Sequence, residues 1–389
     1  MDNIDEIREL RIAWLVPSVE LGAYWQPVLR EFTTLFKNTI FYTGLVWPGF
    51  DPQVPGANVI QIVGKMKSLE MTQTTGYSRR LMLLSPGIVP HLLEFKPHVI
   101  LAQAYSVWTL LALLLKPWQK WRFIIIYDGS SPNADFQDSK IRSFFRRVMS
   151  RYADAFVANS HGAKEYLIKG VGAKPELVFT KTYLVPDAIT LQHSLDKDKT
   201  VEETLKRPIF LYVGRITPRK GLKSLLEACS ILRSQGYQNY SLQVVGTGEQ
   251  QEELEAFIVD SHLEEQVKWV GWVEYGRLGA YFQQADVFVF PTLEDIWGMV
   301  ALEAMVFGKP VLCSRWAGAA EVVMEGKNGY IFDPYQPQEL ASTMRHFLDH
   351  PELIDAMGQQ AQQLIREKNP SSAAKSFGEV IDSVLGRGT

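Results

Sequence analysis

Cations and glycines follow an apolar run directly at the start of the second half of the chain. The segment YVGRITPRKGLKSLLEA (residues 212–228) contains Gly214, Arg215, Lys220 and Gly221 between a strand-like run and a helix-length stretch. Glycine lets a backbone approach an anion closely, a helix N-terminus adds positive potential, and two cations at one strand end suit a diphosphate. A turn with solvated basic side chains explains this segment equally well.

A glycine pair enters the next helix-length stretch. In VVGTGEQQEELEAF (residues 244–257), Gly246 and Gly248 separate an apolar run from an amphipathic one, but Gln251 stands where a dinucleotide fingerprint has its third glycine. A tight turn into a helix explains the pattern as well as a bound nucleotide does. NAD binding is disfavoured.

A third segment, KWVGWVEYGRLGAYF (residues 268–282), ends an apolar run at Val270 and continues with Trp272 and Val273. A flat apolar platform with free backbone groups suits a nucleobase. Packing of Trp272 in the core is the alternative.

The fourth segment, FPTLEDIWGMVALEAMVFGKPVL (residues 290–312), has the most specific pattern. Glu294 and Asp295 follow a strand-like run, and Glu303 lies inside the apolar helical stretch ALEAMVF. A carboxylate in such a run costs several kcal/mol unless it has a partner, and ribose hydroxyls are one candidate. The amides of residues 297–300 at the helix start could meet sugar hydroxyls or phosphate.

Elements that could position these residues alternate along the whole chain. Helix-length stretches, such as 140–152, 222–235 and 250–261, separate short runs that are apolar on both sides, as in a parallel sheet covered on both faces. The predicted strands are 11–16, 39–41, 59–62, 99–102, 123–127, 155–158, 209–213, 242–245, 267–270, 287–290 and 310–313. This predicts a doubly wound α/β fold, whose ligands bind at the carboxyl ends of the strands.

The strand series starts twice, because a charged, strand-poor stretch precedes a fresh strand at Ile209. We therefore expect two Rossmann-like domains. The expected boundaries are 1–190 for the first domain, 191–207 for a linker, 208–369 for the second domain, and 370–389 for a C-terminal helix that returns to the first domain.

Composition excludes several classes of protein. The net charge of −3 divides into +5 over residues 1–200 and −8 over the rest, which argues against dedicated nucleic-acid binding. Apolar runs are too short for a spanning helix of about 20 residues, and the acidic N-terminus is no secretory signal. Two distant cysteines indicate a reducing compartment and no cysteine-based metal site.

Taken together, the four segments resemble the C-terminal half of the GT4 family, the retaining, nucleotide-sugar-dependent glycosyltransferases of group 1 with the GT-B fold. The resemblance covers about residues 209–345. It implies an α/β protein with two Rossmann-like domains facing across a cleft. It also implies roles for individual residues: Arg215 and Lys220 hold the donor diphosphate near Gly214 and Gly246; Val270, Trp272, Val273 and Leu278 line the base; Ile296, Trp297, Gly298, Met299 and Val300 hold the transferred sugar; and Glu303 binds the ribose.

The first acidic position departs from the family pattern Glu-x7-Glu, since Asp295 stands there and Glu294 precedes it. Either Asp295 takes the catalytic role beside Arg215 and Lys220, or Glu294 shares it. The spacing to Glu303 favours Asp295.

The first half resembles the family more loosely. Gly22 falls where relatives have a glycine loop that touches the donor phosphate, and Tyr127-Asp128 stands where relatives often carry His-Asp. Tyr127 and Asp128 are therefore the acceptor-side candidates. The resemblance does not identify the acceptor of this protein.

The resemblance implies a transferase that moves a hexose, by family frequency glucose, from a UDP-sugar to a polysaccharide, oligosaccharide or lipid-linked acceptor, with retention and without a metal or other cofactor. Asp196-Lys197-Asp198, a motif of metal-dependent transferases, falls in the charged linker and is interpreted as solvated. A nucleotide-sugar epimerase of the same fold and a non-catalytic nucleotide-sugar-binding subunit are the alternatives.

The stretch KIRSFFRRVMSRY (residues 140–152) mixes five basic residues with large apolar ones. Such a helix could rest on anionic lipid, and an ordinary helix with a basic outer face explains it equally well. We expect a cytoplasmic protein, with peripheral contact at the inner membrane surface as an option through this stretch.

Overall fold

The computed structural model describes residues 9–17, 22–46, 50, 52–53, 56–64, 67–71, 79–131, 133, 135, 139–193 and 205–387. Contacts divide the chain into two compact units, one of Met1–Val185 with Lys368–Thr389 and one of Pro186–Glu367. The expected boundaries were 190 and 369. Residues 191–193 of the expected linker form the end of helix α7 (Ala188–His193), and most of the rest, including Asp196 to Asp198, lies outside the described residues.

The first unit is built on a parallel sheet of seven strands with the order β3-β2-β1-β6-β7-β8-β9. Its strands are β1 (Ile12–Val16), β2 (Thr39–Thr43), β3 (Ile60–Ile62), β6 (Val99–Gln103), β7 (Arg122–Tyr127), β8 (Ala155–Ala158) and β9 (Val178–Thr180). The strand order reverses direction between β1 and β6, which makes this a doubly wound sheet.

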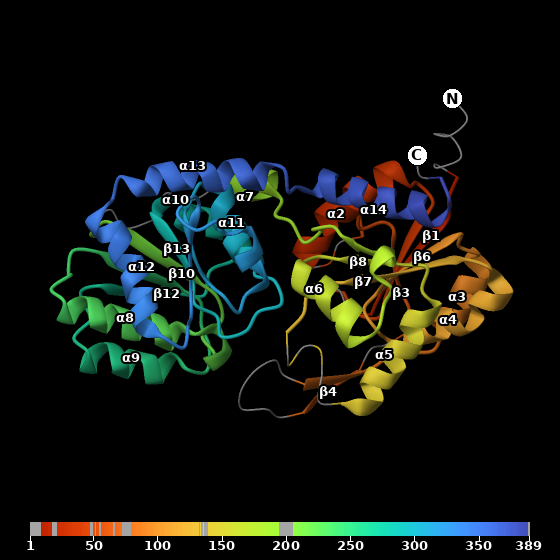
Figure 1. Cartoon of the computed structure of the whole chain (residues 1–389), viewed down its shortest axis with the longest axis horizontal. Coiled ribbons are helices and arrows are strands. Elements are labelled where there is room, and N and C mark those ends of the chain that lie inside the picture. The colour runs from red at the N-terminus through yellow and green to blue at the C-terminus, as the bar shows by residue number, and fades with distance from the viewer. Residues whose placement is uncertain are drawn as a thin grey trace. The chain divides into compact units, whose positions relative to one another are not determined.

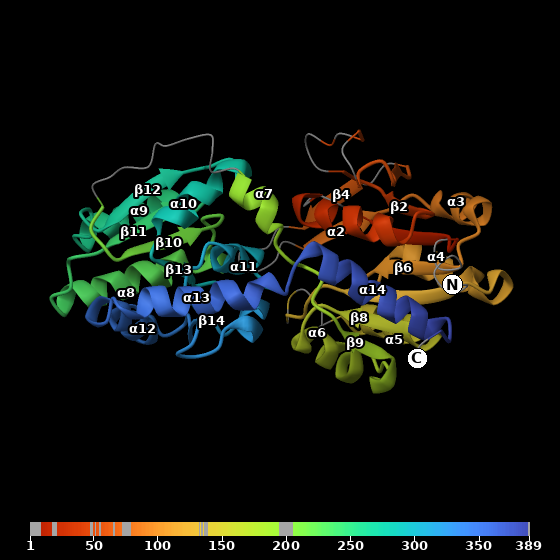
Figure 2. The same ribbon diagram turned by 90° about the horizontal axis from the view of Figure 1, so that it is seen from above.

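Alternate residues of these strands fill two cores, one on each face of the sheet. Ile12 and Trp14 pack with helices α2 (Gly22–Leu35) and α14 (Pro370–Val384), and the rings of Trp14 and Phe377 lie 4.8 Å apart. Figure 2 shows α14 beside α2. The other face is covered by α3 (Ile88–Phe95), α4 (Val107–Gln119), α5 (Lys140–Tyr152) and α6 (His161–Glu165). Burial on both faces explains the continuous apolar runs.

All eleven predicted strands are present, with ends that differ by up to two residues. Within the described residues, four further strands were not predicted: β9, β15 (Gly329–Phe332) and the antiparallel pair β4 (Lys67–Met71) and β5 (Arg79–Leu83). Each is short or carries charged residues, so it lacks the apolar run that marks the others.

The second unit contains a parallel sheet of six strands, ordered β12-β11-β10-β13-β14-β15. These are β10 (Ile209–Val213), β11 (Ser241–Val245), β12 (Val267–Gly271), β13 (Val287–Phe290), β14 (Val311–Ser314) and β15. Numbered within the unit, this is the 3-2-1-4-5-6 order of a Rossmann fold, and its switch point lies between β10 and β13. The expected fold class is confirmed in both units.

Helices cover both faces of this second sheet (Figure 1). One layer holds α8 (Leu222–Ser234), α9 (Gln251–Asp260) and α12 (Pro337–Asp349); the other holds α10 (Leu278–Gln284), α11 (Met299–Val306) and α13 (Leu353–Arg366). Among the described residues of the whole chain, no helix is long and apolar enough to cross a membrane.

Candidate functional site

Two loops meet at the switch point of the second sheet, one after β10 and one after β13. Gly221 ends the short turn Pro218–Lys220 with φ +69°, and a Cβ there would lie 1.9 Å from the carbonyl oxygen of Pro291. Only glycine fits this approach. The amide of Leu293 then donates to the carbonyl of Arg219 at 2.8 Å. These contacts bring the basic turn against the acidic loop.

Asp295 is the carboxylate that faces the cations of this turn. Its Oδ2 lies 2.6 Å from Lys220 Nζ and 3.5 Å from the Arg219 guanidinium, and its Oδ1 accepts a hydrogen bond from the Trp297 amide at 3.2 Å. Burial raises the pKa of the Asp295 carboxyl, but the two cations and the amide outweigh burial and hold that pKa below its usual range. Asp295 is therefore ionised at neutral pH.

Glu294, the alternative for the first acidic position, is buried and differently placed. Its backbone carbonyl accepts hydrogen bonds from Arg219 Nη1 at 2.6 Å and from the Thr292 hydroxyl at 3.0 Å. The structure thus brings Asp295, rather than Glu294, to Lys220. Arg219 was not predicted as a site residue. The one available signal was its position beside Lys220.

Glu303 lies in the first turns of α11 and is 1% exposed. The Tyr275 hydroxyl donates to its Oε1 at 2.9 Å. Burial raises the pKa of Glu303 to about 7, and the hydrogen bond from Tyr275 lowers it in part. Among the described residues, none hydrogen-bonds the second carboxylate oxygen. Tyr275, 28 residues earlier in the chain, was not predicted, because no sequence pattern links the two positions.

The N-terminus of α11 starts at a glycine that cannot cap it. Gly298 has φ +108°, and a Cβ there would lie 2.4 Å from the ring of Phe290. No side chain therefore accepts the amides of Met299 and Val300 from this position. Amides of a first helical turn have no acceptor inside the helix, so they are available to hydroxyl or phosphate oxygens. Ile296 and the buried Trp297 connect Asp295 to this turn, and the Trp297 amide is already used by Asp295.

Arg215 is exposed and forms no ion pair with any residue that the structure describes. Its carbonyl accepts the Tyr212 hydroxyl at 2.9 Å, which fixes the backbone while the guanidinium stays in solvent. The predicted glycines are more constrained. Gly214 donates its amide to Val245 O at 3.0 Å, and Gly246 donates to Gly271 O at 2.7 Å. Their amides extend the sheet, so close packing explains both glycines better than direct phosphate contact through these amides.

The predicted base platform follows β12. Trp272 is 73% exposed, so the alternative that it packs in the core is wrong. Val270 and Val273 are half-buried. Leu278, at the start of α10, is buried. An exposed indole beside half-buried valines leaves an apolar surface open to a planar ligand.

The residues predicted in the first half belong to the first unit. Gly22 is the first residue of α2, and residues 18–21 before it lie outside the described residues. The Tyr127 hydroxyl donates to Asp135 at 2.5 Å, and its ring stacks on Tyr166. Asp128 accepts hydrogen bonds from Gln103 and from the Tyr183 hydroxyl, and burial raises its pKa. Tyr127 and Asp128 thus lie side by side at the end of β7 but bond to different partners.

Residues 195–364 match the family model of glycosyl transferases group 1. The chain is 29% identical over 168 residues to alpha-D-kanosaminyltransferase from Streptomyces kanamyceticus, a match that covers 43% of each chain. It is 34% identical over 151 residues to the amylovoran biosynthesis glycosyltransferase AmsK from Erwinia amylovora, which covers 37% of each. The chain thus spans less than half the length of these curated relatives.

The whole fold is similar to that of solved structures. HepE from Anabaena in complex with UDP aligns with a TM-score of 0.75 at 18% identity, over 96% of this chain and all of that one. WaaG, described as a glycosyltransferase involved in lipopolysaccharide biosynthesis, aligns with a TM-score of 0.63 at 15% identity, over 96% of this chain and all of that one. At these identities the likeness establishes the fold, which is GT-B.

Proposed function

We propose that this chain is a retaining glycosyltransferase of the GT4 type that uses a UDP-hexose donor, with glucose as the first candidate, because residues 195–364 match the family model of glycosyl transferases group 1. The observation that carries the proposal is the cluster at the switch point. There Lys220 and Arg219 flank Asp295, next to the uncapped start of the helix that contains Glu303. UDP and UDP-glucose bound to HepE support the choice of donor.

Each part of the donor meets a matching group in this proposal. Arg215 and Lys220 bind the diphosphate, and Trp272 with Val270 carries the base. The free oxygen of Glu303 accepts a ribose hydroxyl. The amides of Met299 and Val300 bind the transferred hexose, with Asp295 as the acidic group next to it.

The transfer itself requires charge stabilisation more than a protein nucleophile. The bond between the anomeric carbon and the phosphate oxygen breaks, the acceptor oxygen bonds to that carbon from the same face, and the acceptor proton passes to the leaving phosphate. Arg215, Arg219 and Lys220 offset the charge that the diphosphate gains. No metal or other cofactor is needed in this scheme.

The acceptor is a hydroxyl of a polysaccharide, an oligosaccharide or a lipid-linked sugar. AmsK is named for amylovoran biosynthesis and WaaG for lipopolysaccharide biosynthesis, which supports a carbohydrate acceptor. Cytoplasmic location, with contact between α5 and the inner membrane surface, is part of the proposal.

The test combines binding with turnover. Thermal shift with UDP-, GDP- and ADP-sugars identifies the base, and release of UDP from UDP-glucose in the presence of EDTA measures metal-independent reaction. Arg215→Ala should weaken UDP binding by about tenfold or more. Lys223→Ala, which removes an exposed lysine just after the same turn, should leave it unchanged.

The outcomes separate the alternatives. A new UDP-sugar without free UDP would identify an epimerase. Binding of UDP-glucose without any product, across acceptor preparations, would identify a non-catalytic subunit. No thermal shift with any nucleotide sugar, or loss of turnover with EDTA, would contradict the proposed reaction.

A further inference from the structure

Exposed aromatic side chains follow two neighbouring strands of the second sheet, β14 and β15. Trp316 comes shortly after the end of β14 and is 49% exposed, and Tyr335 comes shortly after the end of β15 and is 63% exposed. Among the described residues, neither ring packs on another aromatic ring. Because β14 and β15 are parallel neighbours, both residues lie at the carboxyl edge of the sheet, the edge that also carries Asp295.

The loop after β14 is fixed to the loop that carries Asp295. The Asp295 amide donates to the Trp316 carbonyl at 3.1 Å, and the Gly318 amide donates to the Asp295 carbonyl at 3.0 Å. The Trp316 amide donates to the Ser314 hydroxyl at 3.1 Å. Both backbone groups of Trp316 are therefore used. Its half-exposed ring is the part that remains available to a ligand beside Asp295.

Arg315 joins the loops after β14 and β15. Its amide donates to the Phe332 carbonyl at 2.9 Å, and its guanidinium pairs with Asp333 at 3.7 Å and with Glu339 at 3.2 Å. The Asp333 carboxylate also accepts a hydrogen bond from the Tyr335 amide at 3.0 Å. The two exposed rings thus extend from loops that hold each other in place.

The side chains of these loops suit a carbohydrate. The C–H faces of a pyranose ring pack on aromatic rings, and its hydroxyls hydrogen-bond to planar polar groups such as guanidinium and carboxylate. Both kinds of group occur here, since the half-exposed Arg315 and Glu339 accompany the two rings. Two carboxylates already match the charge of Arg315, which favours a neutral sugar over a phosphorylated or acidic one.

The positions of the strands indicate how long the ligand is. Neighbouring strands of a sheet lie about 4.8 Å apart, so β13, which precedes Asp295, and β15 are about 10 Å apart. A single hexose beside Asp295 does not extend over this distance, whereas a chain of linked hexoses does.

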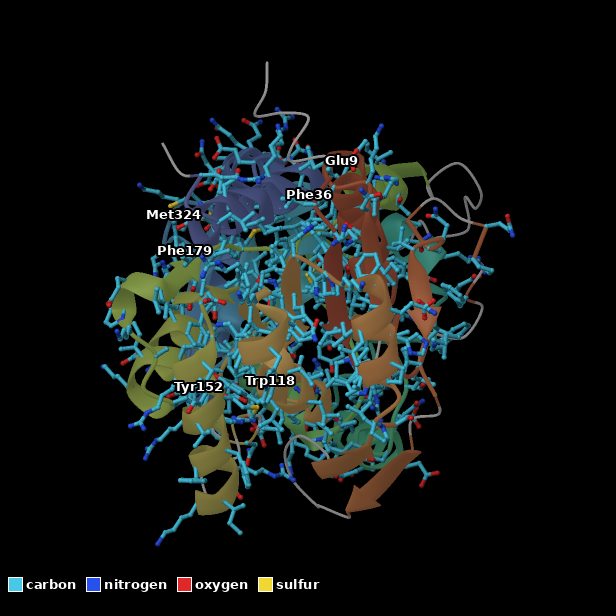
Figure 3. All side chains as sticks on the ribbon, turned by 90° about the vertical axis from the view of Figure 1, so that its right-hand side faces the viewer. Glu9, Phe36, Trp118, Tyr152, Phe179 and Met324 are labelled. Carbon is cyan, nitrogen blue, oxygen red and sulfur yellow. The ribbon has the colours of Figure 1, made fainter. Side chains whose placement is uncertain are left out.

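Exposed rings of the first unit lie at the other end of their sheet. Trp118 and Tyr152 (Figure 3) are at the ends of helices α4 and α5, just before strands β7 and β8. They therefore lie near the amino ends of the strands, and ligands of α/β sheets bind at the carboxyl ends. These two residues are controls of matching chemistry.

We propose that the loops after β14 and β15 form two subsites for a neutral oligosaccharide acceptor. The sugar that receives the hexose packs on Trp316, the next sugar of the chain packs on Tyr335, and the Arg315 cluster bonds to their hydroxyls. This rests on the proposed transferase function and narrows its acceptor to a chain of at least two hexoses. It also places part of acceptor recognition in the second unit, whereas Tyr127 and Asp128 belong to the first.

Binding of sugars in the presence of UDP tests the two subsites. The probe is an array of hexoses, disaccharides and longer oligosaccharides, attached through their reducing ends and titrated with the fluorescently labelled full chain. We expect at least one series in which affinity rises about tenfold from the monosaccharide to the disaccharide. Tyr335→Ala should abolish this rise and leave the monosaccharide unaffected. Trp316→Ala should weaken every length about fivefold to tenfold.

Matched variants complete the experiment. Trp316→Phe and Tyr335→Phe keep a ring at each position and should retain most of the affinity. Trp118→Ala and Tyr152→Ala remove exposed rings of the first unit and should bind sugars as the wild type does. An unchanged thermal transition and UDP-induced shift show that each variant is folded.

The outcomes separate this inference from the transferase assignment. A wild type that neither shifts with UDP nor releases UDP from UDP-glucose contradicts both. A wild type that does both, but binds no sugar more tightly as the chain lengthens, contradicts the acceptor subsites alone, as do wild-type affinities of Trp316→Ala and Tyr335→Ala. If Trp316→Ala loses affinity for UDP-glucose but not for UDP, the ring contacts the transferred hexose and its acceptor role is overturned.

Discussion

Polar residues lie at or after the ends of the strands in both units, but those of the first unit hydrogen-bond to one another and several of those in the second do not. In the first unit, Gln103, Asp128 and Tyr183 bond to one another, and Tyr127 bonds to Asp135. In the second unit, the guanidinium of Arg215 and one oxygen of Glu303 have no bond to any described residue, and no side chain caps the start of α11.

This contrast separates polar groups that hold a fold together from polar groups that await a ligand. In the first unit the Asp128 and Asp135 carboxylates each accept two hydrogen bonds, and these bonds stabilise their surroundings. Among the first-unit side chains named above, only Gln103 has a buried atom, Oε1, without a described partner. The Arg215 guanidinium, the second oxygen of Glu303 and the amides at the start of α11 have no described partner at the switch point, so they can bind a polar ligand. Tyr127 already donates its hydroxyl proton to Asp135, so its oxygen can only accept a hydrogen bond from a further group while that bond is kept.

The largest expected effect comes from breaking the network of the first unit. Asp135→Ala removes the acceptor of the Tyr127 and Ser130 hydroxyls and should cost about 3 kcal/mol of stability. Asp135→Asn, which keeps an acceptor oxygen, should cost less. Calorimetric melting measures both. The affinity of the folded variants for UDP should stay within about twofold of wild type. A loss of UDP affinity without a lower melting temperature would contradict the contrast.

The second effect concerns the cations of the second unit. Lys220→Met keeps most of the side-chain volume but removes the charge that pairs with Asp295. We expect UDP affinity to fall about 30-fold, as for other hydrogen bonds to charged groups, in isothermal titration calorimetry. Lys223→Met, at an exposed lysine paired with Glu253, is the matched control. Equal affinities in both variants would remove Lys220 from the diphosphate site.

A third prediction concerns pH. Burial raises the pKa of Glu303 to about 7, and an ionised carboxylate accepts ribose hydroxyls more strongly. Affinity for UDP-glucose, whose phosphates do not titrate near neutral pH, should therefore rise up to tenfold per pH unit as pH approaches about 7 and level off above it. Glu303→Gln should bind more weakly and lose this dependence.

The same shift affects stability without ligand. The folded protein holds the Glu303 proton more tightly than the unfolded chain does, so its contribution to stability is present below pH 4.5 and is lost as pH rises to about 7. In thermal melting, the melting temperature of Glu303→Gln relative to that of the wild type should therefore rise as the pH increases over this interval. A constant difference between the two proteins would contradict the raised pKa.

Much of the fold of the second unit could be predicted, because buried parallel strands are marked in the sequence by short apolar runs. Apolar runs gave all the strands of that sheet but β15, and the loops after β10 and β13 were correctly placed at one edge, because parallel strands end on the same side. Asp295 was favoured over Glu294 from spacing, and the structure brings Asp295 to Lys220.

The partners of these residues could not be predicted, since they depend on tertiary contacts. Tyr275 meets Glu303 only because the turn Tyr275–Arg277, which precedes α10, folds against α11. The amides of Gly214 and Gly246 are used within the sheet, which no local pattern reveals. Arg146 likewise is a basic residue of the kind expected on the protein surface, but its side chain points inward and hydrogen-bonds to the Asp135 carbonyl. Hydrophobic periodicity predicts which face of a helix is buried, but not which residues pack against that face.

The smallest expected effect sharpens the assignment of the exposed groups. Trp272 is 73% exposed, and stacking of a base on an aromatic ring contributes about 1–3 kcal/mol. At the lower end of that range, which suits a ring open to solvent, Trp272→Ala should weaken UDP binding about fivefold to tenfold, whereas Trp272→Phe should retain most of the affinity. Tyr335→Ala removes another exposed ring, 63% accessible, elsewhere in the unit and should have no effect. Inorganic pyrophosphate lacks a base, so its affinity, measured by competition, should not distinguish Trp272→Ala from wild type. If both ligands weaken together, Trp272 acts on the shape of the loop after β12 and not on the base.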